Sequence, residues 1–173
     1  FYNFGAVGQN ELHNYVSGFN YTDSVVPYVK FLNNEIAVAV ADDRIMFYKG
    51  DQKPAVLSET LLSEQILSVY TGKEYVGLVY ENKDGVTKYY MDLYNIEGEK
   101  EDTLEFDCEY TDIVITEKTI LIYNKNEWNV YTIGGRMKFS CTYENNIRKI
   151  IPTNHIENYM IVTDDTLETV ILK

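Results

Sequence analysis

The feature that most constrains this chain of 173 residues is a repeated pattern: a hydrophobic residue, a tyrosine and, two to four residues later, a glycine. The tyrosines of the four copies are separated by 46, 46 and 37 residues. A period of this length indicates one supersecondary unit that is stacked several times. The copies read Phe1-Tyr2-Asn3-Phe4-Gly5, Phe47-Tyr48-Lys49-Gly50, Leu93-Tyr94-Asn95-Ile96-Glu97-Gly98 and Val130-Tyr131-Thr132-Ile133-Gly134.

Each unit also contains two apolar runs that end at turn-forming residues. Asn, Asp and Gly follow the second run, as in Asp42-Asp43, and these residues adopt the backbone angles of tight hairpins. Residues 55–67 carry leucines at helical spacing, but the repeat places a strand and then a loop there. The first runs cover 25–31, 66–70, 113–116 and 147–151, and the second cover 36–41, 75–80, 119–123 and 159–163.

Four short strands per unit, called A to D in chain order, predict an all-β fold that forms part of a β-propeller, with about four four-stranded antiparallel blades. We expect strands A and B, the most apolar, to lie inside, and the charged strand D to form the solvated edge. We expect a single segment over 1–173, with a partial blade in 1–24, whole blades in 25–64, 65–110 and 111–146, and a partial blade in 147–173.

A propeller blade cannot leave its flat apolar faces in water, so the two end blades need a cover. The chain is expected to be half of a seven- or eight-bladed ring, or a small closed ring. Three covers are open: closure of the ring on itself, a second copy that makes a homodimer, or a segment outside this chain. Because the chain begins at Phe1 rather than Met, we expect it to be a piece of a longer protein.

Charge and composition exclude several classes of partner and cofactor. The formal net charge of −12 makes the chain a poor partner for nucleic acid or an anionic lipid surface. The longest apolar run, residues 36–41, is too short to cross a membrane. Two cysteines cannot build a four-cysteine zinc site, and two histidines, His13 and His155, leave little for metal chemistry. We therefore expect no metal and no cofactor.

Eight segments of the chain, from ILSVY at residues 66–70 to YMIVTDDTLETVILK at residues 159–173, carry a resemblance. They are similar to the C-terminal half of an uncharacterised family of WD40-like propeller proteins from anaerobic Gram-positive bacteria. The resemblance implies a propeller outside the cytoplasm, attached through an N-terminal transmembrane helix that is absent from this chain. Its motifs are structural, so it assigns no functional residue. The sequence lacks the Trp-Asp pair of eukaryotic WD40 blades. We expect a repeat of the general YVTN or quinoprotein-like type. The segments are ILSVY, YVGLVYEN, MDLYNIEGE, FDCEYTDIVI, TILIYN, WNVYTIGG, KFSCTYENNIRKIIPT and YMIVTDDTLETVILK.

The candidate binding residues are Asp23, Asp112 and Asn145, which hold equivalent positions between strands D and A. Loops of this type line one mouth of a propeller channel, where a ring of carboxylate and amide groups would receive a cationic or sugar-like ligand. The alternative, which we favour, is that each side chain caps its own turn. An enzymatic site would need two carboxylates close together in a pocket, and Glu64 joins Asp23 and Asp112 as a residue to inspect.

Other conspicuous residues have structural readings that we favour. The tyrosines of the repeat are expected to be packing residues rather than a ring of ligand contacts, because every unit places one at the same position. Cys108 and Cys141 are expected to be free thiols on neighbouring blades, too far apart to bridge. The acidic turns are expected to form hairpins rather than to bind calcium; they are Asp42-Asp43, Glu81 with Asp84, and Asp164-Asp165.

The function predicted from these features is a non-catalytic propeller module that binds a protein or a cell-envelope ligand outside the cytoplasm. No constellation of acid, base and nucleophile stands out in the sequence. The net charge favours a basic or neutral partner. The alternative is an extracytoplasmic hydrolase or lyase with its site at the mouth of the propeller channel.

Overall fold

Antiparallel strands form wherever an apolar run meets a turn rich in Asn, Asp, Thr or Gly. The computed structural model describes residues 1–3, 14–50, 53–153 and 157–172. The strands in these ranges are β1 (Tyr28–Phe31), β2 (Ile36–Val40), β3 (Arg44–Lys49), β4 (Ala55–Leu61), β5 (Ile66–Thr71), β6 (Tyr75–Glu81), β7 (Tyr89–Asn95), β8 (Lys100–Phe106), β9 (Asp112–Ile115), β10 (Thr119–Tyr123), β11 (Glu127–Thr132), β12 (Met137–Thr142), β13 (Ile147–Pro152), β14 (Asn158–Thr163) and β15 (Leu167–Ile171).

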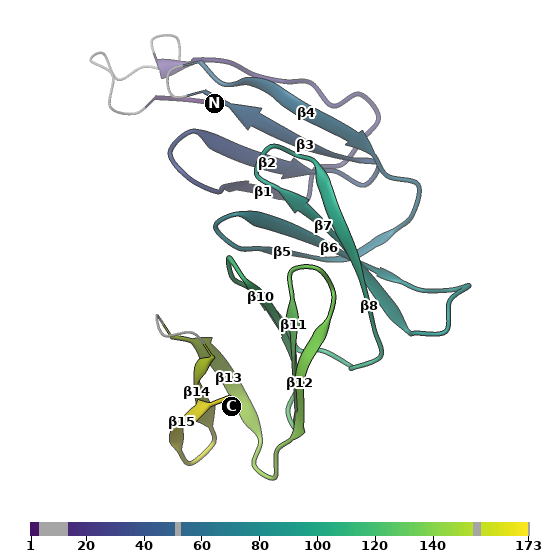
Figure 1. Ribbon diagram of the computed structural model, residues 1–173. Coiled ribbons are helices and arrows are strands. Elements are labelled where there is room, and N and C mark those ends of the chain that lie inside the picture. Colours follow the sequence, from purple (N-terminus) through teal and green to yellow (C-terminus); the bar gives the residue numbers. More distant parts are fainter. Residues whose placement is uncertain (4–13, 51–52, 154–156, 173) are drawn as a thin grey trace.

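Each sheet consists of strands that follow one another in the chain, and every neighbouring pair is antiparallel. We call the sheets blade 1 (β1 to β4), blade 2 (β5 to β8), blade 3 (β9 to β12) and blade 4 (β13 to β15). Figure 1 shows the blades following one another along an open arc, with blade 1 at one end and blade 4 at the other. The predicted all-β propeller fold is confirmed, and the described residues form an arc rather than a closed ring.

The prediction that strands A and B form the buried interior is wrong for strand A. Strands B and C are the buried ones: β2 is buried along its whole length, and so is most of β3. Strand β1 is largely exposed. The reason is topological: in the three four-stranded blades A and D are the edges and only B and C have a strand on both sides, and in blade 4 the edges are β13 and β15.

The core lies between the blades rather than within them. Since alternate side chains of a strand point to opposite faces, each B strand serves two junctions. In β2, Val38 packs toward Leu78 of blade 2, whereas Ala37 and Ala39 face the other way. A second cluster joins blades 2 and 3, and a third, with the fully buried Trp128, joins blades 3 and 4.

The N-terminal segment covers part of the outer face of blade 1. Phe1 and Phe19 pack against Tyr48 of β3, and Tyr2 forms an antiparallel bridge with Tyr15. Three of the four repeat tyrosines, Tyr48, Tyr94 and Tyr131, are buried, which confirms their predicted packing role. The fourth, Tyr2, packs edge-on against Tyr15 but is 52% exposed, so it does not share the buried position of the other three. Gly5, His13 and His155, which were also singled out in the sequence, lie outside the described residues.

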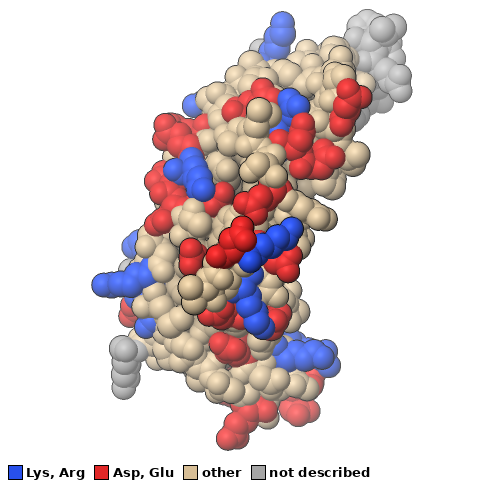
Figure 2. Space-filling view, turned by 90° about the vertical axis from the view of Figure 1, so that its right-hand side faces the viewer, with Lys and Arg blue, Asp and Glu red and all other residues tan. Residues whose placement is uncertain are grey.

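A search of the described residues finds no helix that is long and apolar enough to cross a membrane. Figure 2 shows that Asp and Glu side chains are spread along the face in view, with Lys and Arg between them. On this face the acidic side chains are therefore distributed rather than gathered into one patch.

Gly98 ends the turn between β7 and β8 and touches blade 1. Its φ is +83°, in the left-handed region, and a Cβ atom at this position would lie 2.5 Å from the Cβ of Ser58 in β4. Gly134 occupies the corresponding turn of blade 3, where the nearest atom would be 3.6 Å away. Only Gly98 therefore needs to be glycine for both its conformation and its close approach to a neighbouring blade.

We predict that Gly98→Ala lowers the free energy of unfolding by about 1–3 kcal/mol, because the substitution adds backbone strain and a clash at the junction of blades 1 and 2. Gly134→Ala is the matched control and is expected to change it by less than about 0.5 kcal/mol. Urea unfolding followed by tryptophan fluorescence measures both values. Equal destabilisation by the two substitutions would contradict this account of the junction.

Candidate functional site

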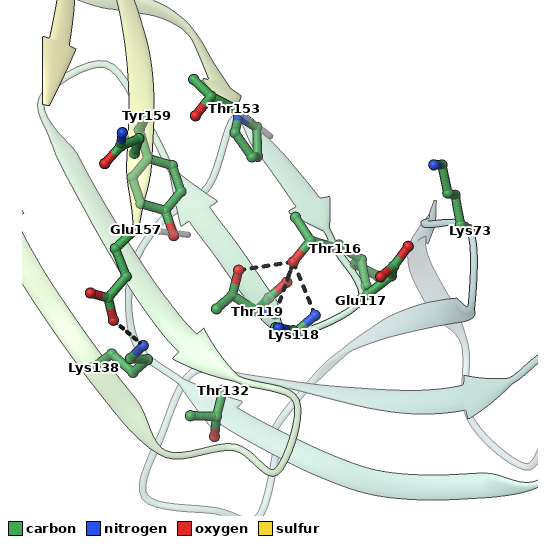
Figure 3. Close-up of a pocket in the computed structure, with 13 residues that line it drawn as sticks. Lys73, Thr116, Glu117, Lys118, Thr119, Thr132, Lys138, Thr153, Glu157 and Tyr159 are labelled. Carbon is green, nitrogen blue, oxygen red and sulfur yellow. Dashed lines mark hydrogen bonds and ion pairs between the residues drawn. The ribbon is translucent and has the colours of Figure 1, made fainter. Parts of the chain in front are cut away.

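A hollow lies at the junction of blades 3 and 4 and reaches one turn of blade 2. Its volume is about 570 Å³, within the range of pockets that hold small ligands or short peptides. We call it the blade 3–4 cleft, and Figure 3 shows most of its side chains. The residues that line it are Lys73, Ile115, Thr116, Glu117, Lys118, Thr119, Thr132, Lys138, Pro152, Thr153, Glu157, Asn158 and Tyr159.

One wall of the cleft is the turn between β9 and β10, which the Thr116 side chain holds in place. Its hydroxyl oxygen accepts hydrogen bonds from the backbone N–H of Lys118 at 3.2 Å and of Thr119 at 2.9 Å. The backbone N–H of Thr116 also donates to the carbonyl of Thr119 at 2.8 Å. This side-chain capped turn fixes the tip of the hairpin, where Glu117 and Lys118 project.

The opposite wall is Tyr159 of β14, which is 3% exposed. Its ring packs edge-on against Trp128, with ring centroids 5.4 Å apart, so the blade 3–4 junction holds it rigidly. Figure 3 shows its hydroxyl directed toward the Thr116–Thr119 turn. No hydrogen bond joins this hydroxyl to another described residue, although it borders the cleft. It is therefore a polar group available to a ligand.

Three lysines gather at this cleft on an otherwise acidic molecule. Lys138 Nζ lies 2.7 Å from the carboxylate of Glu157, and this ion pair neutralises both charges. Lys73 and Lys118 form no ion pair within the described part of the chain. With Glu117 as the remaining carboxylate, the cleft carries a net charge of about +1, which suits one negatively charged group.

The residues predicted from the sequence lie at the other end of the blades. Asp112 is the first residue of β9, where its carboxylate accepts from the Ile113 N–H at 2.9 Å and from the Tyr123 hydroxyl at 3.0 Å. Asp23 is exposed with φ +59°, and Asn145 is exposed in the loop before β13. No hydrogen bond or ion pair among the described residues links these three, and their role as a binding site stays a prediction.

Glu64, the further residue inspected for an enzymatic site, accepts a hydrogen bond from the Tyr90 hydroxyl at 2.8 Å. Glu64 lies two residues before β5 and receives a tyrosine of β7, whereas Asp112 begins β9 and receives a tyrosine of β10. Within the described chain no hydrogen bond or ion pair joins Glu64 to Asp112 or Asp23. Both contacts hold the loop that leads from one blade to the next.

Two of the three acidic turns are engaged in ion pairs, through Asp43 and Asp164. The Asp43 carboxylate lies 2.7 Å from Arg44, which lowers the pKa of Asp43 to about 2, and Arg44 also pairs with Glu59 at 2.7 Å. Asp164 pairs with Arg148, and that contact lowers the pKa of Asp164 as well. Among the described residues, no three His, Cys, Asp or Glu side chains cluster as a metal ion would require.

Cys108 and Cys141 are free thiols, as predicted. Cys108 is buried in the core between blades 2 and 3, whereas Cys141 packs at the edge of the core between blades 3 and 4. Burial, together with the nearby Glu127 carboxylate, raises the pKa of the Cys108 thiol to about 12. Since the thiolate is the reactive form, Cys108 is inert in the folded protein.

We expect iodoacetamide at pH 8.5 to alkylate Cys141 at least tenfold faster than Cys108, since almost no Cys108 thiolate exists at that pH. Mass spectrometry of digested samples taken over time measures both rates. In 6 M guanidinium chloride the two rates should become similar, which serves as the control. Equal rates in the folded protein would show that Cys108 is not buried.

Residues 1–172 match a family described as a family of unknown function, DUF5711. Since the match spans nearly the whole chain, the protein belongs to this family. No curated protein matches the sequence.

Solved structures resemble the fold at low sequence identity. The computationally designed Ika4 protein is 12% identical with a TM-score of 0.58, over 92% of this chain and 96% of that one. BBS1N, solved in complex with ARL6DN, is 8% identical with a TM-score of 0.61, over 92% and 55%. Hsv2 from Kluyveromyces marxianus is 11% identical with a TM-score of 0.57, over 87% and 49%. The chain thus spans about half the length of these two natural neighbours, and the likeness concerns the fold alone.

The cleft was not predicted from the sequence. The turn that carries Lys118 is recognisable as a hairpin, and Lys73 stands at the corresponding turn of blade 2. The sequence feature that indicates the cleft is the presence of lysines at successive A–B turns of an acidic chain. Their convergence with Lys138 and Tyr159 depends on the curvature of the arc, which the sequence pattern does not give.

Proposed function

We propose that this chain is a non-catalytic binding module of a propeller protein and that it binds a protein partner at the blade 3–4 cleft. The observation that carries the proposal is that one cleft holds the ammonium groups of two lysines, Lys73 and Lys118, and the hydroxyl of Tyr159, none of which has an ion partner or a hydrogen bond among the described residues. Turns held by rigid blades present such groups with little loss of conformational entropy on binding.

A protein partner is supported by what propeller-like neighbours do. BBS1N was solved in a complex with ARL6DN, so a chain of similar fold binds another protein. The distributed negative charge of this chain would repel polyanions at a distance, which disfavours nucleic acid and anionic polymers. A neutral or basic partner would not be repelled by the negative charge of the whole chain. One carboxylate of that partner would be attracted by the net positive charge of the cleft.

The ligand group proposed is a single carboxylate, either an acidic side chain or the C-terminus of a peptide. Lys73 and Lys118 would face its charge, and Tyr159 would donate a hydrogen bond to it. Ile115 and Pro152 line the same cleft and would contact an adjacent apolar side chain. A doubly charged phosphate fits less well, because Glu117 leaves a net charge of only about +1 at the cleft.

The test uses synthetic hexapeptides with one C-terminal carboxylate, each compared with its amidated form on an array. For the best binder, Lys73→Gln with Lys118→Gln should weaken affinity about tenfold, at roughly 0.7 kcal/mol per charge. Lys83→Gln, an exposed lysine at the other end of blade 2, is the control and should leave affinity unchanged. Equal binding of the carboxylate and amide forms, or equal effects of the lysine substitutions, would refute the proposal.

We also propose that the propeller lies outside the cytoplasm, attached through an N-terminal transmembrane helix outside this chain, where a cell-envelope component could be its ligand. The family resemblance supports this location. In cells that express the full-length protein, Val86→Cys would place a thiol at a fully exposed position of blade 2. A membrane-impermeant maleimide should label it in intact cells; labelling only after lysis would refute the location.

A further inference from the structure

The last blade exposes a flat apolar face. In β14, Tyr159 and Ile161 point toward blade 3, so Met160 and Val162 point to the opposite side. The strand register aligns Ile151 with Met160, Val162 with Leu167, and Asn158 with Ile171. Leu167 is 62% exposed and Ile171 is 60% exposed. We call this surface the open face; its apolar residues are Ile151, Met160, Val162, Leu167 and Ile171.

The turns show what the open face corresponds to in blade 3. Thr153 bonds to Asn158 across the first turn of blade 4 as Thr116 bonds to Thr119 in blade 3. Thr163 bonds to Thr166 across the next turn as Asn124 bonds to Glu127. Counting from these turns, Met160, Val162 and Leu167 take the places of Leu121, Tyr123 and Trp128, all of which are buried against the following blade.

The open face is therefore a blade-binding surface that continues the interface already present at the other three junctions. Its partner must therefore offer the side of a blade that packs on the preceding blade at the other junctions. This chain itself carries part of such a surface, at the edge strand β1 on the side of blade 1 that faces away from blade 2, beside the patch that the N-terminal segment covers. Val29 and Phe31 lie there, opposite Ala39 and Ala37 in the register, and Val29 is 63% exposed. Phe1 contacts Phe31 but leaves most of that ring uncovered.

We infer that a second copy of this chain docks on the open face, so that blade 4 of each copy packs on blade 1 of the other. Both halves of the junction are present on every chain, and two head-to-tail contacts close a ring by a twofold rotation. The natural neighbours of this fold are about twice as long as the matched region, so two copies supply as many blades as one of them. This inference does not depend on the ligand of the blade 3–4 cleft.

The association is expected to strengthen with salt. Each copy carries −12, so two copies repel one another until counter-ions screen them, while burial of apolar faces gains from added salt. Size-exclusion chromatography with light scattering should give about 40 kDa, twice the chain mass of 20.1 kDa, with a larger dimer fraction at 0.5 M than at 0.05 M sodium chloride. A mass near 20 kDa at both salt concentrations would overturn the inference.

Single variants locate the two halves of the junction. Leu167→Glu alters the open face and Val29→Glu alters the face of blade 1, and each should reduce the dimer fraction at least tenfold. Val86→Glu, in an exposed turn of blade 2, is the control and should leave the dimer intact. Circular dichroism confirms that the variants keep the β-fold, so a monomer that is folded supports the inference and a dimer that resists both substitutions overturns it.

A mixing experiment identifies the contact as head-to-tail. When the Leu167→Glu and Val29→Glu variants are combined, the unaltered open face of one meets the unaltered blade 1 of the other. The mixture should therefore recover a mass near 40 kDa that neither variant shows alone, since one intact junction remains. A mixture that stays near 20 kDa would overturn the head-to-tail arrangement.

Discussion

The rest of this structure depends on burial of the two apolar faces of each blade. A four-stranded sheet whose B and C strands are apolar on both sides gains stability only when another surface covers each side. Val38 and Leu78, Val79 and Ile120, and Leu121 and Ile161 belong to the three clusters that meet this need within the chain. The arc therefore behaves as a stack in which each blade is stabilised by its neighbours.

The blade junctions also determine where chemistry can occur. Tyr159 is rigid because its ring packs on Trp128, and its hydroxyl reaches the cleft for the same reason. The Thr116 turn is rigid because its side chain bonds to the backbone that follows. Binding at such a cleft would require little rearrangement of the fold. A ligand in the cleft would also touch both blade 3 and blade 4.

The fold could be predicted from the sequence because each repeated pair of apolar runs corresponds to one blade of the stack. Every predicted second strand, from residues 36–41 to 159–163, has its counterpart in β2, β6, β10 or β14. The prediction for strand A failed because apolar residues such as Val29 and Phe31 mark a surface that needs a cover, not one that already has it. The cleft could not be predicted, because Lys73, Lys118 and Tyr159 belong to three blades and only the curvature of the arc brings them together.

Hydrogen exchange of a Trp128→Ala variant, followed by mass spectrometry, tests most directly whether burial between neighbouring blades stabilises the fold. Removing a buried tryptophan side chain costs about 3–5 kcal/mol, which corresponds to at least a hundredfold change in local opening. The account predicts that β13 to β15 and the facing strands of blade 3 exchange faster by this factor, while β1 to β4 keep their protection. A uniform loss over all four blades, or no change in blade 4, would contradict it.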